Sequence, residues 1–453
     1  MVRFESEKGC RMMSEWSFEV KKARMSIRRF IRSINPVKLH YLENCVSCAA
    51  CASACPYYPI EERYSPVNKA EELRKIYRKE LTIAGKIAGN LFHAYEIRNE
   101  NDVKRILEFA YRCSNCSRCY TMCPFGIDSG AMIVDIRGIL LNIGYAPSLL
   151  RFLSDLDMRG ELPESILKLW EETLSKVKGI IDTESIVERK GSDIIYIPSL
   201  IELVFYPEVI VDTISLLSKL NLKWTIPSKP MGLGMGMFIG DFSSVKTSMK
   251  KLNNYIKRLE IKEILLSDGG YLYPMLRFSL PEIVNEDVKY MITHIVEVLY
   301  DRLSMLDFIT TEEKITWHSP CQLGRKGGVT REPLEILMKI SSNFRRLPHD
   351  GLEAICCGGG GGMALLTREK YDHFRKLGLG FEVSEEEMLF MRDTEEAYKL
   401  SIREKMRDIE RSGAEIVITS CPFCMMTLEL GSKLYGPSIK VIHFSSYLIN
   451  VIK

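Results

Sequence analysis

The sequence predicts a multidomain protein that combines α+β and α/β folds. We expect an α-helical N-terminal module followed by two α/β repeats, the first of which has no cysteines. A run of four cysteines occurs twice in the first third of the chain, and five further cysteines lie in the last third. Between them, short β-branched segments alternate with helical patterns, as is typical of α/β domains. The 453 residues are enough for two or three domains.

Composition excludes several classes of protein. The formal net charge of +3 is too small to indicate nucleic-acid binding. The longest apolar runs are interrupted early, one of them by Glu202, so none reaches the roughly 18 residues of a membrane span. The 14 cysteines, with no secretory signal before them, favour metal in a reducing compartment over disulfides. We therefore expect a cytoplasmic protein that meets a membrane only through a partner subunit or a helix surface.

The repeated run has the spacing C-x2-C-x2-C-x3-C-P, which is typical of two-cluster ferredoxins. Its first three cysteines surround one [4Fe-4S] cubane and its fourth ligates the other. The spacing predicts two cubanes, one held by Cys45, Cys48, Cys51 and Cys123 and the other by Cys113, Cys116, Cys119 and Cys55. A pair of zinc sites is the alternative, but structural zinc usually takes two ligands from each of two hairpins. The occurrence of the run twice favours iron and sulfide.

The residues around the two runs have helical periodicity, whereas a small ferredoxin is mostly strand and loop. Residues 69–78, 102–111 and 129–141 repeat apolar side chains at helical spacing. Asn101 or Asp102 is the expected N-cap of the second of these helices. The first module is therefore predicted to be helical.

The second group of cysteines lies on three separate stretches. Predicted strands at 314–319 and 415–420 end just before Cys321 and Cys421, and carboxyl ends of strands are the usual site of ligands in α/β sheets. Pro422 suits the first position of a helix, whose N-terminus favours a thiolate. Glycines at 358–362 allow close approach of the backbone to a cluster. Metal is expected on the set Cys321, Cys356, Cys357, Cys421 and Cys424.

This constellation resembles the cysteine-rich CCG domain of heterodisulfide reductase catalytic subunits and of the iron-sulfur subunits of several flavin-linked dehydrogenases. The doubled cysteine followed by glycine is its most specific feature. The resemblance implies that the five cysteines hold a non-cubane [4Fe-4S] cluster that binds and splits a disulfide. The helices between the twin runs resemble the α-helical ferredoxin module of fumarate reductase and heterodisulfide reductase iron-sulfur subunits.

Residues 191–305 resemble a copy of the later domain that has lost its ligands. The stretch 263–270 aligns with 415–422, which places Gly269 opposite Cys421 and Leu272 opposite Cys424. The glycine-rich stretch 231–241 corresponds to the double-cysteine loop. Since no cysteine occurs between 124 and 320, this copy cannot hold a thiolate-ligated cluster. We expect it to serve as a packing partner.

The expected organisation has five parts. They are a basic segment at 1–40, a helical ferredoxin at 41–145, a helical connector at 146–190, a cysteine-free repeat at 191–305 and the CCG domain at 306–453, with a helical insertion within 364–400. The basic segment is more simply a solvated helix than a docking surface for an acidic partner or a membrane face. Eight and five cysteines are thereby assigned, which leaves Cys10.

Three further residues are candidates for the site. His318 precedes Cys321 by three positions and could give a proton to a leaving thiolate, although a structural histidine at a strand end is the simpler interpretation. Arg325 and Lys326 could hold an anionic thiol or offset cluster charge, and a solvated loop explains them equally well. No phosphate loop or dinucleotide fingerprint occurs, so we expect flavin or nicotinamide on another subunit.

The resemblance implies an oxidoreductase chain similar to the catalytic iron-sulfur subunit of heterodisulfide reductases, active with partner subunits. Electrons would pass through two cubanes to the five-cysteine site, where a thiol or disulfide substrate reacts. The partners would be a flavoprotein or a membrane cytochrome or quinone-reactive subunit. The alternative is the iron-sulfur subunit of a flavin-linked dehydrogenase for glycolate, lactate or glycerol 3-phosphate, which relays electrons to quinone. A third is a non-catalytic adaptor in a membrane redox complex.

Overall fold

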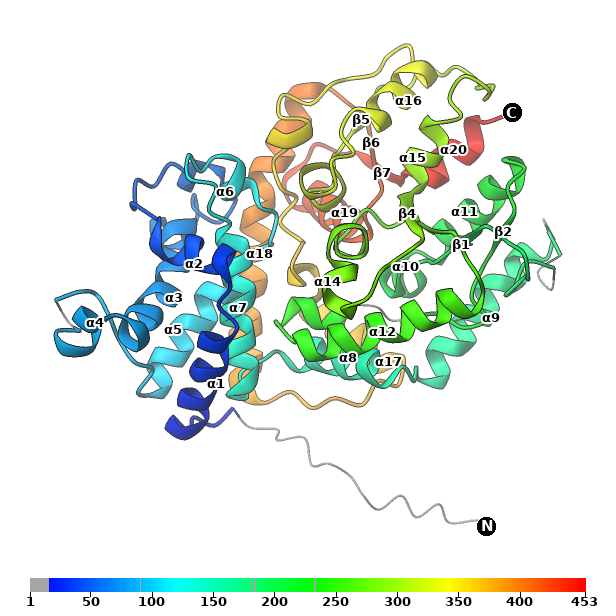
Figure 1. The fold of residues 1–453 in the computed structure, drawn as a ribbon. Coiled ribbons are helices and arrows are strands. Elements are labelled where there is room, and N and C mark those ends of the chain that lie inside the picture. Colours follow the sequence, from blue (N-terminus) through cyan, green and yellow to red (C-terminus); the bar gives the residue numbers. More distant parts are fainter. Residues whose placement is uncertain (1–15, 90, 180, 183–184, 232–233) are drawn as a thin grey trace.

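The computed structural model describes residues 16–89, 91–179, 181–182, 185–231 and 234–453. A helical module lies on one side of the molecule, and two α/β units with parallel sheets lie on the other (Figure 1). The predicted mixture of helical and α/β parts is confirmed at this level. Cys10, part of the basic segment and part of the glycine-rich stretch 231–241 lie outside the described residues. The predicted domain boundaries stay predictions.

The helical module surrounds the twin cysteine runs. α7 begins after Asp128, whose carboxylate accepts hydrogen bonds from the backbone N–H groups of Gly130 and Ala131. The cap of α5 differs from the expectation: Asn99, in extended conformation, accepts from Asp102 N, and Asn101 and Asp102 lie inside the helix. The helices are α1 (Val20–Arg32), α2 (Pro36–Glu43), α3 (Pro66–Leu81), α4 (Ile83–Ile87), α5 (Glu100–Ala110), α6 (Arg118–Thr121) and α7 (Ser129–Asn142).

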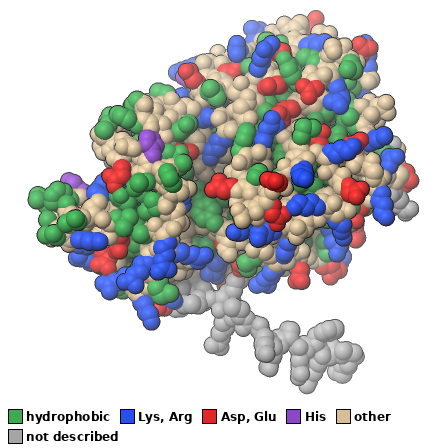
Figure 2. Space-filling model, viewed as in Figure 1, with side chains coloured by type: hydrophobic (Ala, Val, Ile, Leu, Met, Phe, Trp, Pro, Cys, Tyr) green, Lys and Arg blue, Asp and Glu red, His purple; other side chains and the backbone are tan. Residues whose placement is uncertain are grey.

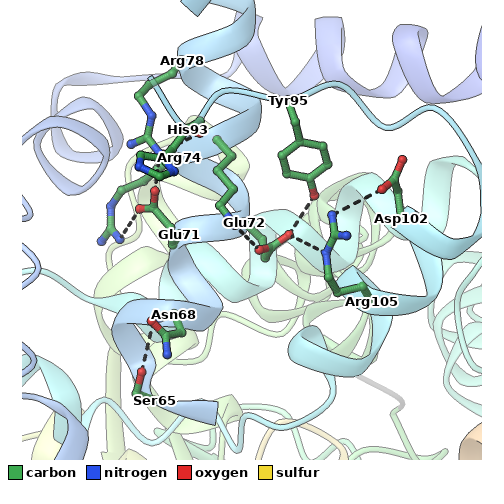
Figure 3. A network of polar contacts seen from close by, with 11 residues as sticks. Ser65, Asn68, Glu71, Glu72, Arg74, Arg78, His93, Tyr95, Asp102 and Arg105 are labelled. Atoms are coloured by element: carbon green, nitrogen blue, oxygen red, sulfur yellow. Dashed lines mark hydrogen bonds and ion pairs between the residues drawn. The ribbon is translucent and has the colours of Figure 1, made fainter. Parts of the chain in front are cut away.

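A buried carboxylate ties this module together (Figure 3). Glu72 on α3 accepts from Tyr95 Oη at 2.8 Å and from Arg105 Nε, on α5, at 3.3 Å. Lys75 Nζ adds a third contact at 2.9 Å. A buried charge needs such partners, because desolvation of an unpaired carboxylate is costly. The network therefore fixes α3 relative to α5 and to the loop before it.

The described part of the basic N-terminal segment is mainly helix α1. Its apolar face packs on α7, where Ser26 Oγ donates to Ile139 O at 3.1 Å. Arg24 Nε reaches Glu96 at 2.7 Å and is otherwise exposed. No helix in the described ranges is both long and apolar enough to cross a bilayer.

The first α/β unit contains a four-stranded parallel sheet in the order β2-β1-β3-β4. Two connector helices, α8 (Ser148–Arg159) and α9 (Glu164–Val177), precede it. The strands are β1 (Ile194–Tyr196), β2 (Trp224–Thr225), β3 (Glu263–Leu266) and β4 (Met291–His294); the helices are α10 (Leu200–Phe205), α11 (Pro207–Lys219), α12 (Phe242–Arg258), α13 (Leu272–Pro274), α14 (Leu280–Val284) and α15 (Ile295–Tyr300).

The second α/β unit has a three-stranded parallel sheet in the order β5-β6-β7, which corresponds to β1-β3-β4. Its helix α18 lies between this unit and the helical module, where Arg112 Nη1 donates to Thr394 Oγ1 at 2.9 Å. The strands are β5 (Ile315–Trp317), β6 (Ile416–Thr419) and β7 (Lys440–His443); the helices are α16 (Glu332–Ile340), α17 (Arg368–Lys376), α18 (Glu385–Ser412), α19 (Pro422–Tyr435) and α20 (Phe444–Val451). The stretch 364–400 is thus largely helical, as predicted.

The two units share a local device at their last strands. His294 ends β4 and caps α15, and His443 ends β7 and caps α20; in each case Nδ1 accepts a backbone N–H at 3.2 Å. Burial lowers the pKa of His294 to about 3 and that of His443 to about 4, so both rings are neutral caps. The carboxyl ends of β3 and β6 also meet, because Gly269 N donates to Ser420 O at 2.6 Å.

Candidate metal centres

The first candidate centre, the outer site, is a small cavity at the surface of the helical module. Its lining includes the four cysteines Cys45, Cys48, Cys51 and Cys123. Cys48 is exposed, and the other three are partly buried. This is the grouping that the spacing predicts, in which the last cysteine comes from the second run.

The second candidate centre, the inner site, lies deeper in the same module. Its cavity is lined by Cys55, Cys113, Cys116 and Cys119, so the last cysteine of the first run faces the second run. Lys69, which is 2% exposed, donates to Cys55 Sγ at 3.3 Å and to Arg112 O at 2.7 Å. An ammonium in this position favours thiolate, the form that binds metal.

The two runs share an unusual backbone. Ser47 and Ala49 have φ of 55° and 59°, and the corresponding Asn115 and Ser117 have φ of 52° and 55°. Such left-handed conformations are uncommon for residues other than glycine and cluster at functional sites. The same two positions are left-handed in both runs, so each loop is wound in the same way around its cavity.

The third candidate centre, the five-cysteine site, lies where the predicted strands end. Cys321 follows β5, and Cys421 is the N-cap of α19, with Pro422 at its first position. The Sγ atoms of Cys357 and Cys424 are 3.5 Å apart. Four of the five cysteines are buried and Cys321 is partly exposed. The open side of this site is therefore at Cys321.

The inner site and the five-cysteine site are in contact. Ser114 Oγ lies 3.1 Å from Cys356 Sγ. The thiol of Cys116 also interacts with the thiol of Cys356, and this interaction lowers the pKa of Cys356. The neighbouring thiols of Cys321 and Cys357, together with burial, outweigh it, so the pKa of Cys356 is raised overall. These contacts place the five-cysteine site directly beside the second cysteine run.

The glycines after Cys357 make this junction. A Cβ on Gly360 would lie 2.5 Å from Ser114 O, and one on Gly359 would lie 2.1 Å from Thr427 Oγ1. We expected the run to approach a cluster, and the structure shows it approaching the second cysteine run and α19. Gly358 and Gly361 also need positive φ, 98° and 62°.

Arginine side chains anchor the same junction. The buried Arg137 of α7 donates to Cys113 O at 2.8 Å and to Gly361 O at 2.6 Å. Arg325 Nη1 donates to Cys116 O at 2.8 Å. Arg325 thus holds backbone carbonyls and is not simply part of a solvated loop; a role in holding an anionic thiol or offsetting cluster charge stays a prediction. Nothing in the local sequence marks Arg137, because its partners are distant carbonyl oxygens.

Comparison with known proteins assigns both cysteine-bearing regions. Residues 41–127 match the 4Fe-4S dicluster domain, and residues 315–378 and 387–429 match the cysteine-rich CCG domain. The chain contains a dicluster domain and a CCG domain. The resemblance inferred from the cysteine motifs is thus confirmed.

Several relatives of this dicluster and CCG protein are named as oxidoreductase subunits. The Hdr-like menaquinol oxidoreductase iron-sulfur subunit 2 of Archaeoglobus fulgidus is 26% identical over 377 residues, which are 71% of this chain and 68% of the relative. One subunit of the dihydromethanophenazine:CoB–CoM heterodisulfide reductase of Methanosarcina mazei is 22% identical over 413 residues, 88% and 91% of the two chains. One subunit of the CoM/CoB fumarate reductase of Methanothermobacter marburgensis is 22% identical over 390 residues, 86% and 68%.

His318 lies at the five-cysteine site of the CCG domain. A ring nitrogen of His318 and the sulfurs of Cys357 and Cys424 all lie within 4.8 Å of one another. Burial lowers the pKa of His318, so the ring is neutral, although Cys357 is close enough to oppose this shift. Among the described residues neither ring nitrogen has a partner at hydrogen-bond distance. Its side chain is therefore free to interact with whatever the cysteines bind.

The donor set fits iron-sulfur clusters. All thirteen described cysteines are free, and they gather in three groups without a disulfide. Burial raises the pKa of Cys113 and Cys119 in the inner site, although Lys69 and Arg137 oppose the shift at Cys113. Grouped thiols of this kind are good ligands for soft metals once metal binding has deprotonated them. The comparisons support iron-sulfur clusters in both domains, and their number and type belong to the proposal below.

The cysteine-free unit has a buried pair of acids near the carboxyl ends of its strands. Asp268 follows β3, next to Gly269, and is buried together with Glu202. Burial raises the pKa of both carboxyl groups. Ser267 Oγ donates to Glu202 at 2.6 Å. Sequence analysis missed this pair, because only the fold brings the two residues together.

Proposed function

We propose that this chain is the iron-sulfur subunit of an Hdr-like reductase complex. In this proposal the outer site holds one cubane, the inner site holds a second, and the five cysteines of the CCG domain hold a non-cubane [4Fe-4S] cluster. Electrons pass along this series to a disulfide, or in reverse from two thiols. The observation that carries the proposal is the contact of Ser114 and Cys116 with Cys356.

This contact supports the order of the three sites. The inner site adjoins the five-cysteine site, and the outer site is the one with an exposed cysteine, Cys48. In this order the outer site, at Cys48, exchanges electrons with a partner and the CCG domain exchanges them with the substrate. Sites built into one rigid junction can exchange electrons without a mobile carrier, and the protein sets their potentials through charge, hydrogen bonds and burial.

A hydrophobic rim around the outer site supports docking of a redox partner there. Val46, Met122 and Phe125 are large apolar side chains that remain exposed, Val46 at 62%. Hydrophobic side chains also gather on the surface near α6 and α2 in Figure 2. Exposed apolar patches on soluble proteins commonly mark interaction sites. The matched relatives are named as subunits, which agrees with such a partner.

The side chains at the CCG site suit disulfide chemistry. A bound cluster would supply electrons and a sulfur-binding metal. Burial of Cys356, Cys357, Cys421 and Cys424 excludes water, and the partly exposed Cys321 leaves one side for the substrate. A disulfide takes up two electrons and two protons and leaves as two thiols. His318 is placed to hydrogen-bond a sulfur, and negative charge on a reduced cluster would favour the protonated ring, which can give one of these protons.

Anaerobic purification tests the proposal. We expect about three tetranuclear clusters per chain by iron and sulfide analysis, and reduction of small disulfides with reduced viologen as electron donor. Zinc in place of iron, or a CCG site without iron, would contradict the cluster assignment. Three clusters without disulfide turnover would indicate the relay of a flavin-linked dehydrogenase, an alternative that the reported relatives do not favour.

A further inference from the structure

A fully buried lysine lies on α18 beside the CCG site. The side chain of Lys405 is 0% exposed, and its Nζ donates to Asp408 Oδ2 at 2.9 Å; the Asp408 side chain is 1% exposed. Lysine is almost never fully buried unless it is paired, because desolvation of an ammonium group is costly. A buried ion pair adds little to stability compared with apolar packing, so this one invites a functional explanation.

The ion pair continues to the surface. The second carboxylate oxygen of Asp408, Oδ1, lies 2.8 Å from Nδ1 of His349, whose side chain is 38% exposed. Burial alone would raise the pKa of Asp408, but Lys405 and His349 lower it by more. The pKa of Asp408 is therefore below its usual value, and this carboxyl group stays ionised. The ammonium group of Lys405 thus keeps a charged partner.

The pair lies on the helix that packs against the five-cysteine site. Ser401 lies one turn before Lys405 on the same side of α18, and a Cβ on Gly358, the residue after Cys357, would lie 2.5 Å from Ser401 Oγ. Burial lowers the pKa of the Lys405 ammonium group, while Asp408 and a thiolate at Cys357 oppose this shift. Lys405 therefore lies on the part of α18 that packs against the double-cysteine loop of the five-cysteine site.

A cluster held by five thiolates would carry net negative charge, which makes it harder to reduce. A buried cation close by offsets this charge with little screening, because solvent does not reach it. Iron-sulfur potentials respond to net charge, to hydrogen bonds and to burial. Lys405 can therefore act on the potential through its charge alone.

We propose that Lys405 is a built-in counter-charge of the five-cysteine site, which raises the reduction potential of the cluster held there and so draws electrons from the inner site. Asp408 opposes it and limits the effect. When one electron is transferred, the inner cluster is oxidised by one equivalent and the five-cysteine cluster is reduced by one equivalent. This inference depends on the proposed function, because it needs a cluster at these cysteines.

The test is a redox titration followed by paramagnetic resonance on the anaerobic holoprotein. Lys405→Met should make the midpoint potential of the five-cysteine cluster more negative, and Asp408→Asn should make it more positive. Lys399→Met is the matched control, because Lys399 lies on the same helix, is partly exposed and pairs with Glu395. It should leave the potential unchanged.

Two further outcomes keep the tests separate. If Lys405→Met does not retain the cluster, Asp408→Asn and the neutral double variant Lys405→Met/Asp408→Asn decide: the double variant should have a midpoint potential slightly below that of wild type, because the charge that dominates, Lys405, is removed together with Asp408. An unchanged potential in Lys405→Met, or a shift of Asp408→Asn in the negative direction, overturns the counter-charge. Absence of this cluster from the wild-type protein overturns the proposed function instead.

Discussion

At the scale of single residues, His318 is the group whose chemistry depends most on what the cysteines bind. Its ring is buried, neutral and without a hydrogen-bond partner among the described residues, and it lies close to Cys357 and Cys424. A purely structural histidine in such a place would normally be hydrogen-bonded, as His294 is to Ser267 O at 2.8 Å. The contrast favours a functional role.

His318→Ala tests this role. We expect unchanged iron content and a rate of disulfide reduction about 100-fold lower, since a positioned general acid typically contributes 10²–10⁴-fold. Initial rates with reduced viologen measure the effect. His373→Ala, on α17, is the control and should keep the full rate. Full activity of His318→Ala at full iron content would leave His318 with packing alone.

Asp157 on α8 carries a second prediction at this scale. Its carboxyl group is buried and accepts from Met235 N at 3.1 Å, and burial raises its pKa to about 8. In the unfolded chain the pKa of an aspartate is about 4. The folded protein therefore holds an extra proton between these values, and its stability must fall as the pH rises through that window.

Asp157→Asn should remove this dependence, because the amide keeps the shape and does not titrate. Relative to wild type, the variant should gain roughly 2 to 4 kcal/mol between about pH 5 and pH 8. Thermal or denaturant unfolding at several pH values measures the difference. Asp287→Asn, at an exposed position, is the control. A difference between variant and wild type that does not change with pH would contradict the assignment.

At the scale of elements, the glycine run at 358–362 determines how closely the CCG domain approaches the second cysteine run. Gly360→Ala places a Cβ 2.5 Å from Ser114 O, a backbone atom that cannot move away alone. We expect a loss of about 1 to 3 kcal/mol of stability, as for other overpacked sites, together with slower electron transfer to the five-cysteine site.

Gly380→Ala is the matched control for this substitution. A Cβ at Gly380 has no atom within 4 Å, and neither glycine has a positive φ, so only the steric contact differs between the two variants. Unfolding midpoints and stopped-flow reduction measure both effects. Equal behaviour of the two variants would mean that the junction is looser than the structure indicates.

At the scale of the whole molecule, the two cysteine runs depend on each other, because the fourth cysteine of each run lines the cavity of the other run. Cys55 lines the inner cavity although it belongs to the first run, and Cys123 lines the outer cavity although it belongs to the second. Loss of either residue should therefore affect the cluster of the other run.

Cys55→Ser and Cys123→Ser test this exchange. Paramagnetic resonance of the reduced protein should show that Cys55→Ser loses the same signal as Cys116→Ser, and that Cys123→Ser loses the same signal as Cys48→Ser. Only the variants of the inner site should stop electrons from reaching the five-cysteine cluster. The opposite pairing of signals would mean that each run binds its own cluster.

Much of the site could be predicted from the sequence, because its chemistry is local. The spacing within each run, the strand before Cys321 and Pro422 at the start of α19 are short-range features, and each lies where the pattern predicts. The cap of α5 was missed, because several residues near its start could serve and backbone conformation selects Asn99.

The sequence by itself determined that this protein has two four-cysteine runs and a CCG cysteine set, since residue type and spacing are properties of short segments. Only the tertiary structure decided that the inner site adjoins the CCG domain, that Arg137 and Arg325 hold their junction, and that the helix carrying the buried Lys405 packs against the double-cysteine loop. The physical reason is that these contacts join residues far apart in the chain through backbone carbonyls and buried charges. Neither kind of group leaves a periodic or spaced signal in a sequence.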